Sequence, residues 1–247
     1  KAKFPHLTLL SSEENLGFAG GNNIGIKHAL AQKARFVLLL NNDALIEANC
    51  LKILVEKLNQ ADPNVGVTAA KVYYAHDRKR IWTVGSNFRP WLLEVEDLGK
   101  GAIDSGQWGE VKQIEFIPFC GVLFKAEVFE EVGLLDDRYF LYYEDMDYCQ
   151  RLKAHNTKIL LTPDALIWHA VSTSSGGGLS ANALYWRAKS SVLYFREYGR
   201  GWLMLLIAPF RLLSALRLTL TLVRGSSFSE IKSYWFGLRD GLSDPSP

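Results

Sequence analysis

The chain has 247 residues, 48% of them hydrophobic and 22% charged, which suits one large globular domain or a domain with an appendage. Its 28 Lys and Arg residues nearly balance 26 Asp and Glu residues, so net charge does not indicate a nucleic-acid-binding protein. Three cysteines without a CxxC pair argue against a disulfide framework or a zinc ribbon and favour a reducing compartment.

The first half of the chain alternates strand and helix patterns. We expect strands at Leu7–Leu10, 35–40 and Val65–Ala70, with helices ending near Lys33 and spanning about Glu47–Asn59. The continuous apolar run at 35–40 predicts a central strand that is buried on both faces. This alternation predicts an α/β fold with a doubly wound, right-handed, mostly parallel sheet flanked by helices.

The second half is less regular at first, and residues 73–113 predict meandering strands and loops. A strand over Phe116–Lys125 is then interrupted at Cys120-Gly121. Small residues over Ser172–Gly178 predict a mobile loop that could close over a site. The remaining expected elements are a helix at Ala126–Val132, a loop at Gly133–Tyr143, a helix at Glu144–Ala154 and a strand at Thr157–Leu161 ending before Pro163.

The C-terminal tail contains a long apolar run, Trp202–Val223, interrupted by Pro209, Arg211 and Arg217. Each arginine in a membrane-spanning helix would cost roughly 2.5–3.5 kcal/mol near the middle of the bilayer. At helical spacing the arginines fall on one side and most leucines on the other, which indicates a basic amphipathic helix lying in a membrane interface. The alternative is a helix that packs on the domain itself.

Polar residues follow the apolar strand where it ends, at Asn41, Asn42 and Asp43. In open α/β sheets ligands bind at the carboxyl ends of strands, and an acid there can hold Mg²⁺ or Mn²⁺ beside a diphosphate. Taken alone, these residues more simply end a strand and cap the next helix. Gly20-Gly21 lacks the known phosphate-loop patterns, and either exposes backbone amides to an anionic ligand or only caps a helix.

Three acids, Glu144, Asp145 and Asp147, stand within four positions. Mutual repulsion makes such a cluster costly unless a metal, an arginine or a substrate hydroxyl uses it. The alternative is an acid-rich first helical turn that interacts with the helix dipole. His169 follows an apolar strand and becomes a candidate ligand only if the fold brings it near Asp43.

The ordered motifs NxGFAGGNNxGI, LLLNND, a CG pair, VGLLDDRYFLYYEDMDYCQRL and WHAVSTSSG resemble family 2 glycosyltransferases of the GT-A fold. They are most similar to the rhamnosyltransferase-like branch, which builds bacterial surface polysaccharides. We therefore expect residues 1–195 to form a GT-A domain and residues 196–247 to form a basic amphipathic helical tail. Family members begin with a strand–helix–strand unit that holds the nucleoside, and since this unit is missing here we expect a fragment.

The resemblance implies an inverting hexosyltransferase that moves a sugar from a nucleotide-diphosphate donor, such as dTDP-rhamnose or a UDP-sugar, to a hydroxyl. It implies a lipid-linked or polysaccharide acceptor at the inner face of the cell membrane. By the same resemblance Asp145 is the catalytic base, Asp43 and His169 bind Mg²⁺ or Mn²⁺, and Glu144 and Asp147 support the base. The implied donor-binding residues are Asn15, Gly21, Asn22, Asn41, Asn42, Cys120 and Gly121.

Two features leave other functions open. Asn41 stands where many relatives carry Asp, which weakens the metal assignment. The missing N-terminal unit favours an alternative, a catalytically inactive relative that acts as a sugar-binding or assembly subunit. A nucleotidyltransferase finds no support, since no Gly-rich signature with a following Arg and Lys is present.

Overall fold

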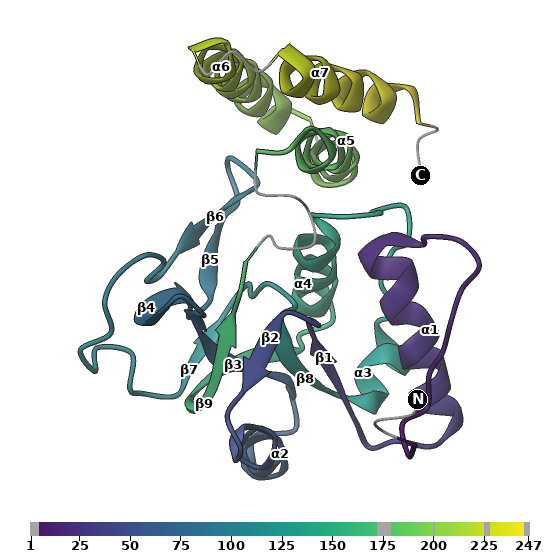
Figure 1. The fold of residues 1–247 in the computed structure, drawn as a ribbon, viewed down its shortest axis with the longest axis vertical. Coiled ribbons are helices and arrows are strands. Elements are labelled where there is room, and N and C mark those ends of the chain that lie inside the picture. The colour runs from purple at the N-terminus through teal and green to yellow at the C-terminus, as the bar shows by residue number, and fades with distance from the viewer. Residues whose placement is uncertain (1–4, 172–178, 200, 225–227, 245–247) are drawn as a thin grey trace.

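The computed structural model describes residues 5–171, 179–199, 201–224 and 228–244. A mixed sheet lies at its centre with helices on both faces, and helices α5 to α7 form a separate layer beyond one end of the sheet (Figure 1). The α/β class predicted from the sequence is confirmed.

Strand order across the sheet is β1 (Phe36–Leu40), β8 (Gly121–Lys125), β3 (Val65–Tyr74), β9 (Lys158–His169) and β2 (Ala44–Ile46). β4 (Asp77–Thr83) pairs with β3, and β7 (Lys112–Ile114) pairs with β9. β3 and β9 pair in parallel, and β1 runs in the same direction. The expected parallel arrangement holds for these three strands but not for β8, which lies antiparallel between β1 and β3.

β1 lies at one end of this strand order and pairs with β8 alone among the described strands. The prediction of a central strand there is therefore wrong. The strand expected at Leu7–Leu10 is also not formed, and Leu7 and Leu9 are 65% and 69% exposed. A strand needs a neighbour to satisfy its backbone groups, and none of the described strands pairs with that segment.

β9 continues beyond the predicted end at Pro163 and reaches His169. Its pairing with β3 shifts between Ala70 and Lys71, whose partners are Thr162 and Leu166. Residues 163–165 therefore form a bulge, where the missing N–H of a proline costs no bond in the sheet. This extension carries His169 to the end of the sheet at which β1 also terminates.

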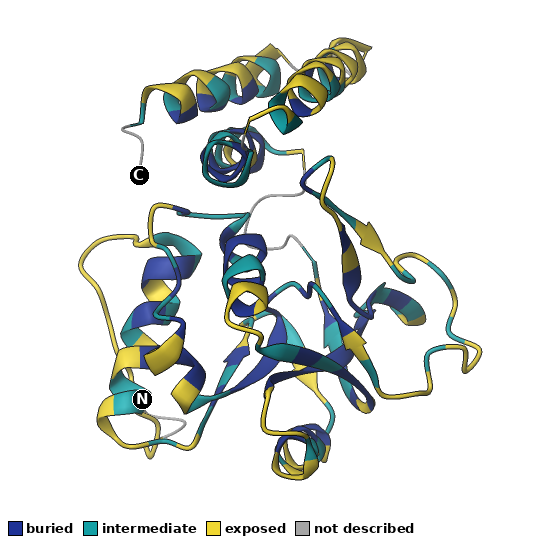
Figure 2. Ribbon diagram, turned by 180° about the vertical axis from the view of Figure 1, so that it is seen from behind, coloured by how far each residue is buried: buried dark blue, intermediate teal, exposed yellow. Residues whose placement is uncertain are grey.

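The two faces of the sheet carry different helices. α2 (Cys50–Gln60) covers one face, while α1 (Gly17–Ala31), α3 (Ala126–Glu131) and α4 (Glu144–Ala154) cover the other (Figure 1). β8 shows the alternation that produces both cores, because Val122 and Phe124 pack on the α4 side and Leu123 on the α2 side. Its residues 121–124 are buried, whereas the outer sides of the helices are exposed (Figure 2).

The C-terminal layer consists of α5 (Ala181–Tyr198), α6 (Leu203–Arg224) and α7 (Phe228–Ser243). α7 packs tightly on α5, because a Cβ atom on Gly237 would lie 2.2 Å from the Tyr185 carbonyl oxygen. The hairpin of β5 (Ser86–Arg89) and β6 (Glu94–Asp97) rises from the sheet toward this layer (Figure 1). The expected boundary after residue 195 falls inside α5, whose C-terminal part packs into the main core.

Candidate active site

The turn after β1 lies beside the end of β9. The Ala44 amide donates to the Asn41 carbonyl at 3.2 Å, which closes the turn, and Ala44 pairs with His169 in the sheet. As a result Asp43 Oδ1 lies 3.0 Å from His169 Nε2, and Asn41 Nδ2 lies 3.3 Å from the same nitrogen. The fold thus brings His169 to Asp43, although the two are far apart in the sequence, and leaves Asn42 exposed beside them.

His169 is buried, with its ring packed edge-on against Trp82 at 4.5 Å between centroids. Burial lowers the pKa of His169, and the charge of Asp43 only partly opposes this effect. Its Nδ1 atom has no hydrogen-bond partner among the described residues. The ring is therefore neutral at pH 7, which is the form of histidine that binds metal ions.

Cys120 and Gly121 lie next to this turn. Gly121 pairs with Leu40, the last residue of β1, and a Cβ atom on Gly121 would lie 2.1 Å from Ile167 Cδ1. Cys120 is 1% exposed, and burial together with the nearby charge of Asp43 raises the pKa of its thiol. Both residues therefore lie next to the turn, Gly121 through its pairing with Leu40 and Cys120 through its closeness to Asp43.

α4 begins at Glu144, as predicted, and carries Asp145 in its first turn. Asp145 is half-buried, its Oδ1 accepts a bond from the Met146 amide at 2.8 Å, and burial raises its pKa to about 7. Burial and the charge of Asp145 raise the pKa of Glu144 well above its usual value, and Glu144 Oε2 has no partner among the described residues. A carboxyl that titrates near neutral pH can accept a proton from a substrate.

One segment connects the start of α4 with the Asp43 turn. The thiol of Cys149 in α4 interacts with the backbone of Ile117, and the Phe119 ring lies 5.9 Å from that of Tyr148. The next residue, Cys120, lies close to Asp43. α4 also begins near the end of β9, at the end of the sheet that lies toward α5 (Figure 1). Both halves of the candidate site therefore lie at one end of the sheet.

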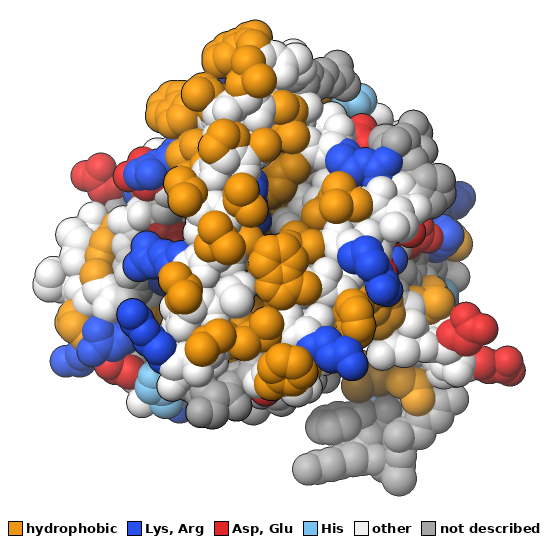
Figure 3. Space-filling model, turned by 90° about the horizontal axis from the view of Figure 1, so that it is seen from above, with side chains coloured by type: hydrophobic (Ala, Val, Ile, Leu, Met, Phe, Trp, Pro, Cys, Tyr) orange, Lys and Arg blue, Asp and Glu red, His pale blue; other side chains and the backbone are white. Residues whose placement is uncertain are grey.

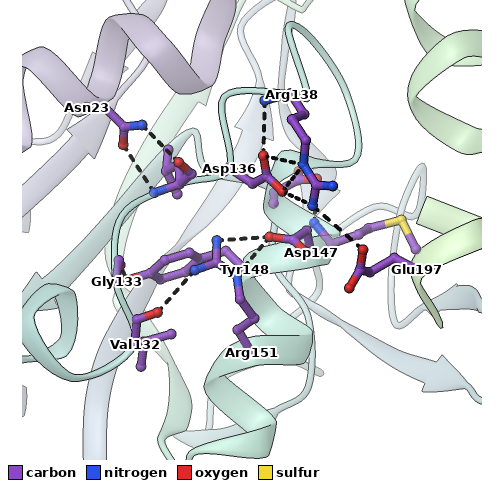
Figure 4. A network of polar contacts seen from close by, with 12 residues as sticks. Asn23, Val132, Gly133, Asp136, Arg138, Asp147, Tyr148, Arg151 and Glu197 are labelled. Carbon is purple, nitrogen blue, oxygen red and sulfur yellow. Dashed lines mark hydrogen bonds and ion pairs between the residues drawn. The ribbon is translucent and has the colours of Figure 1, made fainter. Parts of the chain in front are cut away.

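Asp147 belongs to a separate polar network (Figure 4). Arg151 donates to Asp147 Oδ2 at 2.9 Å, and the Tyr198 hydroxyl donates to Asp147 Oδ1 at 2.7 Å. Arg138 pairs with Asp136 and lies 3.6 Å from Glu197. These contacts fasten α4 to the preceding loop and to α5, so an arginine satisfies this acid, one of the possibilities raised by the sequence.

The glycine-rich segment is helical, and Gly20-Gly21 lies inside the helix and does not cap it. α1 begins at Gly17, so Gly21 and Asn22 lie in its second turn, and the Asn22 side chain donates to the Phe18 carbonyl. Gly17 has a φ of 69°, and a Cβ there would lie 2.1 Å from the Phe140 carbonyl oxygen. Glycine therefore lets α1 approach the loop before α4. Asn15 accepts a bond from the Gly17 amide, which fixes the start of the helix.

Sequence reasoning missed Asn23, which is buried on the inner side of α1. Its side chain donates to the Leu135 carbonyl at 2.8 Å and accepts from the Leu135 amide at 3.1 Å. It thereby attaches α1 to the loop that leads into α4. The helical spacing from Asn23 to Ile26 was the available signal, since it places an amide on the buried side. The expected mobile loop at 172–178 lies outside the described residues.

The family description "Glycosyltransferase like family 2" matches residues 1–188. The chain belongs to glycosyltransferase family 2. It is 26% identical over 151 residues to the low-salt glycan biosynthesis hexosyltransferase Agl10 of Haloferax volcanii, covering 61% of this chain and 47% of that protein. It is 25% identical over 170 residues to the dTDP-rhamnosyl transferase RfbF of Shigella flexneri, covering 69% of this chain and 53% of that protein. The chain thus spans about half the length of these curated relatives.

A crystal structure of GalNAc-T7 with UDP, GalNAc and Mn²⁺ resembles this family 2 chain with a TM-score of 0.54. The likeness covers 77% of this chain and 37% of that one, at 15% sequence identity. At this identity it bears on the fold alone, and it confirms the GT-A architecture expected from the motifs.

Proposed function

We propose that this family 2 chain transfers a sugar, with inversion, from a nucleoside-diphosphate donor to a hydroxyl of a lipid-linked or polysaccharide acceptor. The observation that carries the proposal is the Asp43–His169 pair, 3.0 Å apart, at the end of the sheet where α4 presents Asp145. The relatives include a hexosyltransferase and a dTDP-rhamnosyl transferase, which supports a hexose donor such as dTDP-rhamnose, while a UDP-sugar rests on the resemblance to the family.

A divalent metal ion, Mg²⁺ or Mn²⁺, fits the residues of the Asp43 turn. A carboxylate oxygen and a neutral imidazole nitrogen converge there, beside the Asn41 amide. No larger group of His, Cys, Asp and Glu side chains gathers within the described parts of the chain, which leaves coordination positions for the donor phosphates. When bound, the ion would neutralise charge on the departing diphosphate.

Asp145 would act as general base in this reaction. The acceptor hydroxyl forms a bond to the anomeric carbon while the bond from that carbon to the diphosphate oxygen breaks. The proton of the hydroxyl passes to the Asp145 carboxylate, and the nucleoside diphosphate leaves from the opposite face. With its pKa raised to about 7 by burial, Asp145 is both ionised in part and basic enough to take the proton.

The remaining donor-side assignments rest on the resemblance to the family. Asn41 and Asn42 flank Asp43 and would contact the donor beside it, while Cys120 and Gly121 would hold this turn in place. Asn15, Gly21 and Asn22 would contribute from the start of α1, where Gly21 is exposed and a Cβ atom there would meet no neighbour within 4 Å.

We further propose that α6 and α7 contact the cytoplasmic face of a membrane. The outer side of α6 exposes a row of leucines, and apolar side chains with lysines and arginines around them cover this surface (Figure 3). The row consists of Leu205, Leu206, Leu212, Leu213, Leu216 and Leu220. α6 is long and apolar enough to cross a bilayer, but its opposite side packs on the protein, which supports a position in the interface.

The test of the transferase is release of nucleoside diphosphate from dTDP-rhamnose and from UDP-sugars, measured with Mn²⁺. We expect metal-dependent turnover by this chain, its loss in Asp145→Asn, and its retention in the matched control Asp137→Asn, whose residue is exposed. Absence of both turnover and nucleotide binding would instead support the catalytically inactive subunit.

A further inference from the structure

Arg211 is a charged residue of the apolar helix α6, and it lies on the packed side of that helix. Its guanidinium pairs with Glu94 of β6 and lies over the Phe195 ring of α5, 4.4 Å from the ring centroid. The Arg211 side chain is 27% exposed, whereas Arg217 on the same helix is an exposed residue. Helical spacing placed both arginines on one polar side, but the structure gives them different surroundings.

Arg211 also reaches the residue that precedes the acidic motif. Its guanidinium lies over the Phe195 ring, on which Tyr143 also packs, and its charge opposes the rise in the pKa of Tyr143 that burial causes. The Tyr143 ring packs against Tyr194 and Phe195 of α5, with centroid distances of 5.4 and 6.3 Å. One guanidinium therefore links α6, the β5–β6 hairpin and the start of α4.

The backbone at this point is strained. Tyr142 and Tyr143 have φ values of 68° and 70°, a left-handed conformation that is unfavourable for a non-glycine residue. Such a conformation persists only where its surroundings hold it in place. Here Arg187 of α5 lies 5.0 Å from the Tyr142 ring centroid, and Tyr143 packs on the Phe195 ring that Arg211 covers. The two residues that follow are Glu144 and Asp145.

We propose that Arg211, paired with Glu94, is a positioning residue that fixes the Tyr142–Tyr143 turn and thereby the direction of the Asp145 carboxylate. The proposal rests on the proposed role of Asp145 as general base. It means that α6 is mechanically coupled to the catalytic turn, because the side of the helix opposite the exposed leucines holds the turn. Binding of α6 to another surface would then also fix the position of Asp145.

Hydrogen–deuterium exchange tests this coupling directly, and its readout does not depend on activity. In Arg211→Met we expect amides of residues 142–147 to exchange about tenfold faster, the equivalent of one lost charged hydrogen bond. Arg211→Lys should restore part of the protection, and Glu94→Gln should reproduce part of the loss. The matched control is Arg217→Met, which should leave these amides unchanged. Unchanged exchange in Arg211→Met, or equal acceleration in Arg217→Met, would overturn the proposal.

Kinetics separate this proposal from the proposed function. Arg211→Met should lower kcat about tenfold while leaving the KM for the donor unchanged, because the donor site lies at the Asp43 turn. If the unmodified chain turns over donor and Asp145→Asn abolishes this, but Arg211→Met matches the unmodified chain, only the positioning role fails. If Asp145→Asn leaves turnover intact, the proposed function itself fails. Arg211→Lys and Glu94→Gln provide the same comparison should Arg211→Met not fold.

Discussion

The central sheet and helix α6 are both rich in apolar side chains, but those of the sheet are buried and many of those of α6 are exposed. In β8, Val122 and Phe124 are fully buried between the helices. In α6, Leu205 is 77% exposed and Leu213 is 67% exposed, although α6 is among the most apolar elements described. A large contiguous apolar surface on a folded chain marks a contact with something other than water. The difference separates residues that hold the fold from residues available to a partner.

The ionisable residues of the two regions also differ in their surroundings. Near the end of the sheet Glu144 is buried and Asp145 is half-buried, and burial raises the pKa values of both carboxyls. In α6 the buried-side arginine, Arg211, is paired, and exposed Arg217 lies among the leucines. The carboxyls of the first region are the groups for which we propose a role in proton transfer, while the exposed charge of the second suits attraction to anionic lipid head groups.

The largest expected effect concerns the buried charge. Asp145→Asn should lower the rate of sugar transfer about 1,000-fold, within the range for loss of a general base. The rate of nucleoside diphosphate release, with acceptor present, measures it. Thermal unfolding should show no destabilisation, because the variant removes a carboxyl whose ionised form is disfavoured by burial. A rate within tenfold of the unmodified chain would contradict the role of Asp145.

Phe124→Ala should break the core and lower the free energy of unfolding by about 3–5 kcal/mol. Phe124 is fully buried and packs against Phe119 and Phe129, with centroid distances of 5.3 and 5.1 Å. The matched variant in α6 is Leu213→Ala, which should change this free energy by less than about 0.5 kcal/mol. Urea unfolding compares the two variants. Equal losses would show that Leu213 is a core residue, against the contrast drawn above.

Leu213→Asp should weaken binding to vesicles that contain anionic lipid. Burial of a leucine contributes about 1.5–3 kcal/mol, so we expect a loss of roughly 30-fold in partitioning. Flotation with vesicles of phosphatidylglycerol and phosphatidylcholine measures it, and the control is Leu7→Asp, an exposed leucine outside α6. Binding that is equally strong in both variants would remove the membrane proposal.

The smallest effect is on pH dependence. A general base acts only when it is deprotonated, and burial raises the pKa of Asp145 to about 7. The transfer rate should therefore rise with pH, by about tenfold between pH 6 and pH 8, following the ionised fraction. A rate that is flat over this interval would show that another group, or an Asp145 of ordinary acidity, accepts the proton.

Local signals predicted local structure well. The predicted bounds of α4, Glu144–Ala154, are those of the structure, and the helix carries acids in its first turn and Arg151 and Lys153 in its last turn. The loop before α4 and the short helix α3 were likewise predicted from the sequence. β9 was not, because a proline normally ends a strand, and the bulge at Pro163 depends on the register with β3.

Non-local contacts were beyond sequence patterns. Nothing near His169 in the sequence indicates that β2 pairs with β9 and places Asp43 at 3.0 Å, and only the resemblance to a family suggested the pair. Helical spacing also grouped Arg211 with Arg217 on one side of α6, whereas in the structure Arg211 faces the protein and Arg217 is exposed. The partner of Arg211 is Glu94, a residue of a distant hairpin that no local pattern indicates.

The measurement that tests the account most directly is the effect of Mn²⁺ on the NMR signal of the Met146 methyl group, which adjoins Asp145. If the Asp43–His169 pair binds the ion at the end of the sheet where Asp145 lies, adding Mn²⁺ should broaden this signal, and Asp43→Asn or His169→Ala should abolish the broadening. A Met146 signal untouched at saturating Mn²⁺, or broadening that persists in both variants, would contradict a shared site.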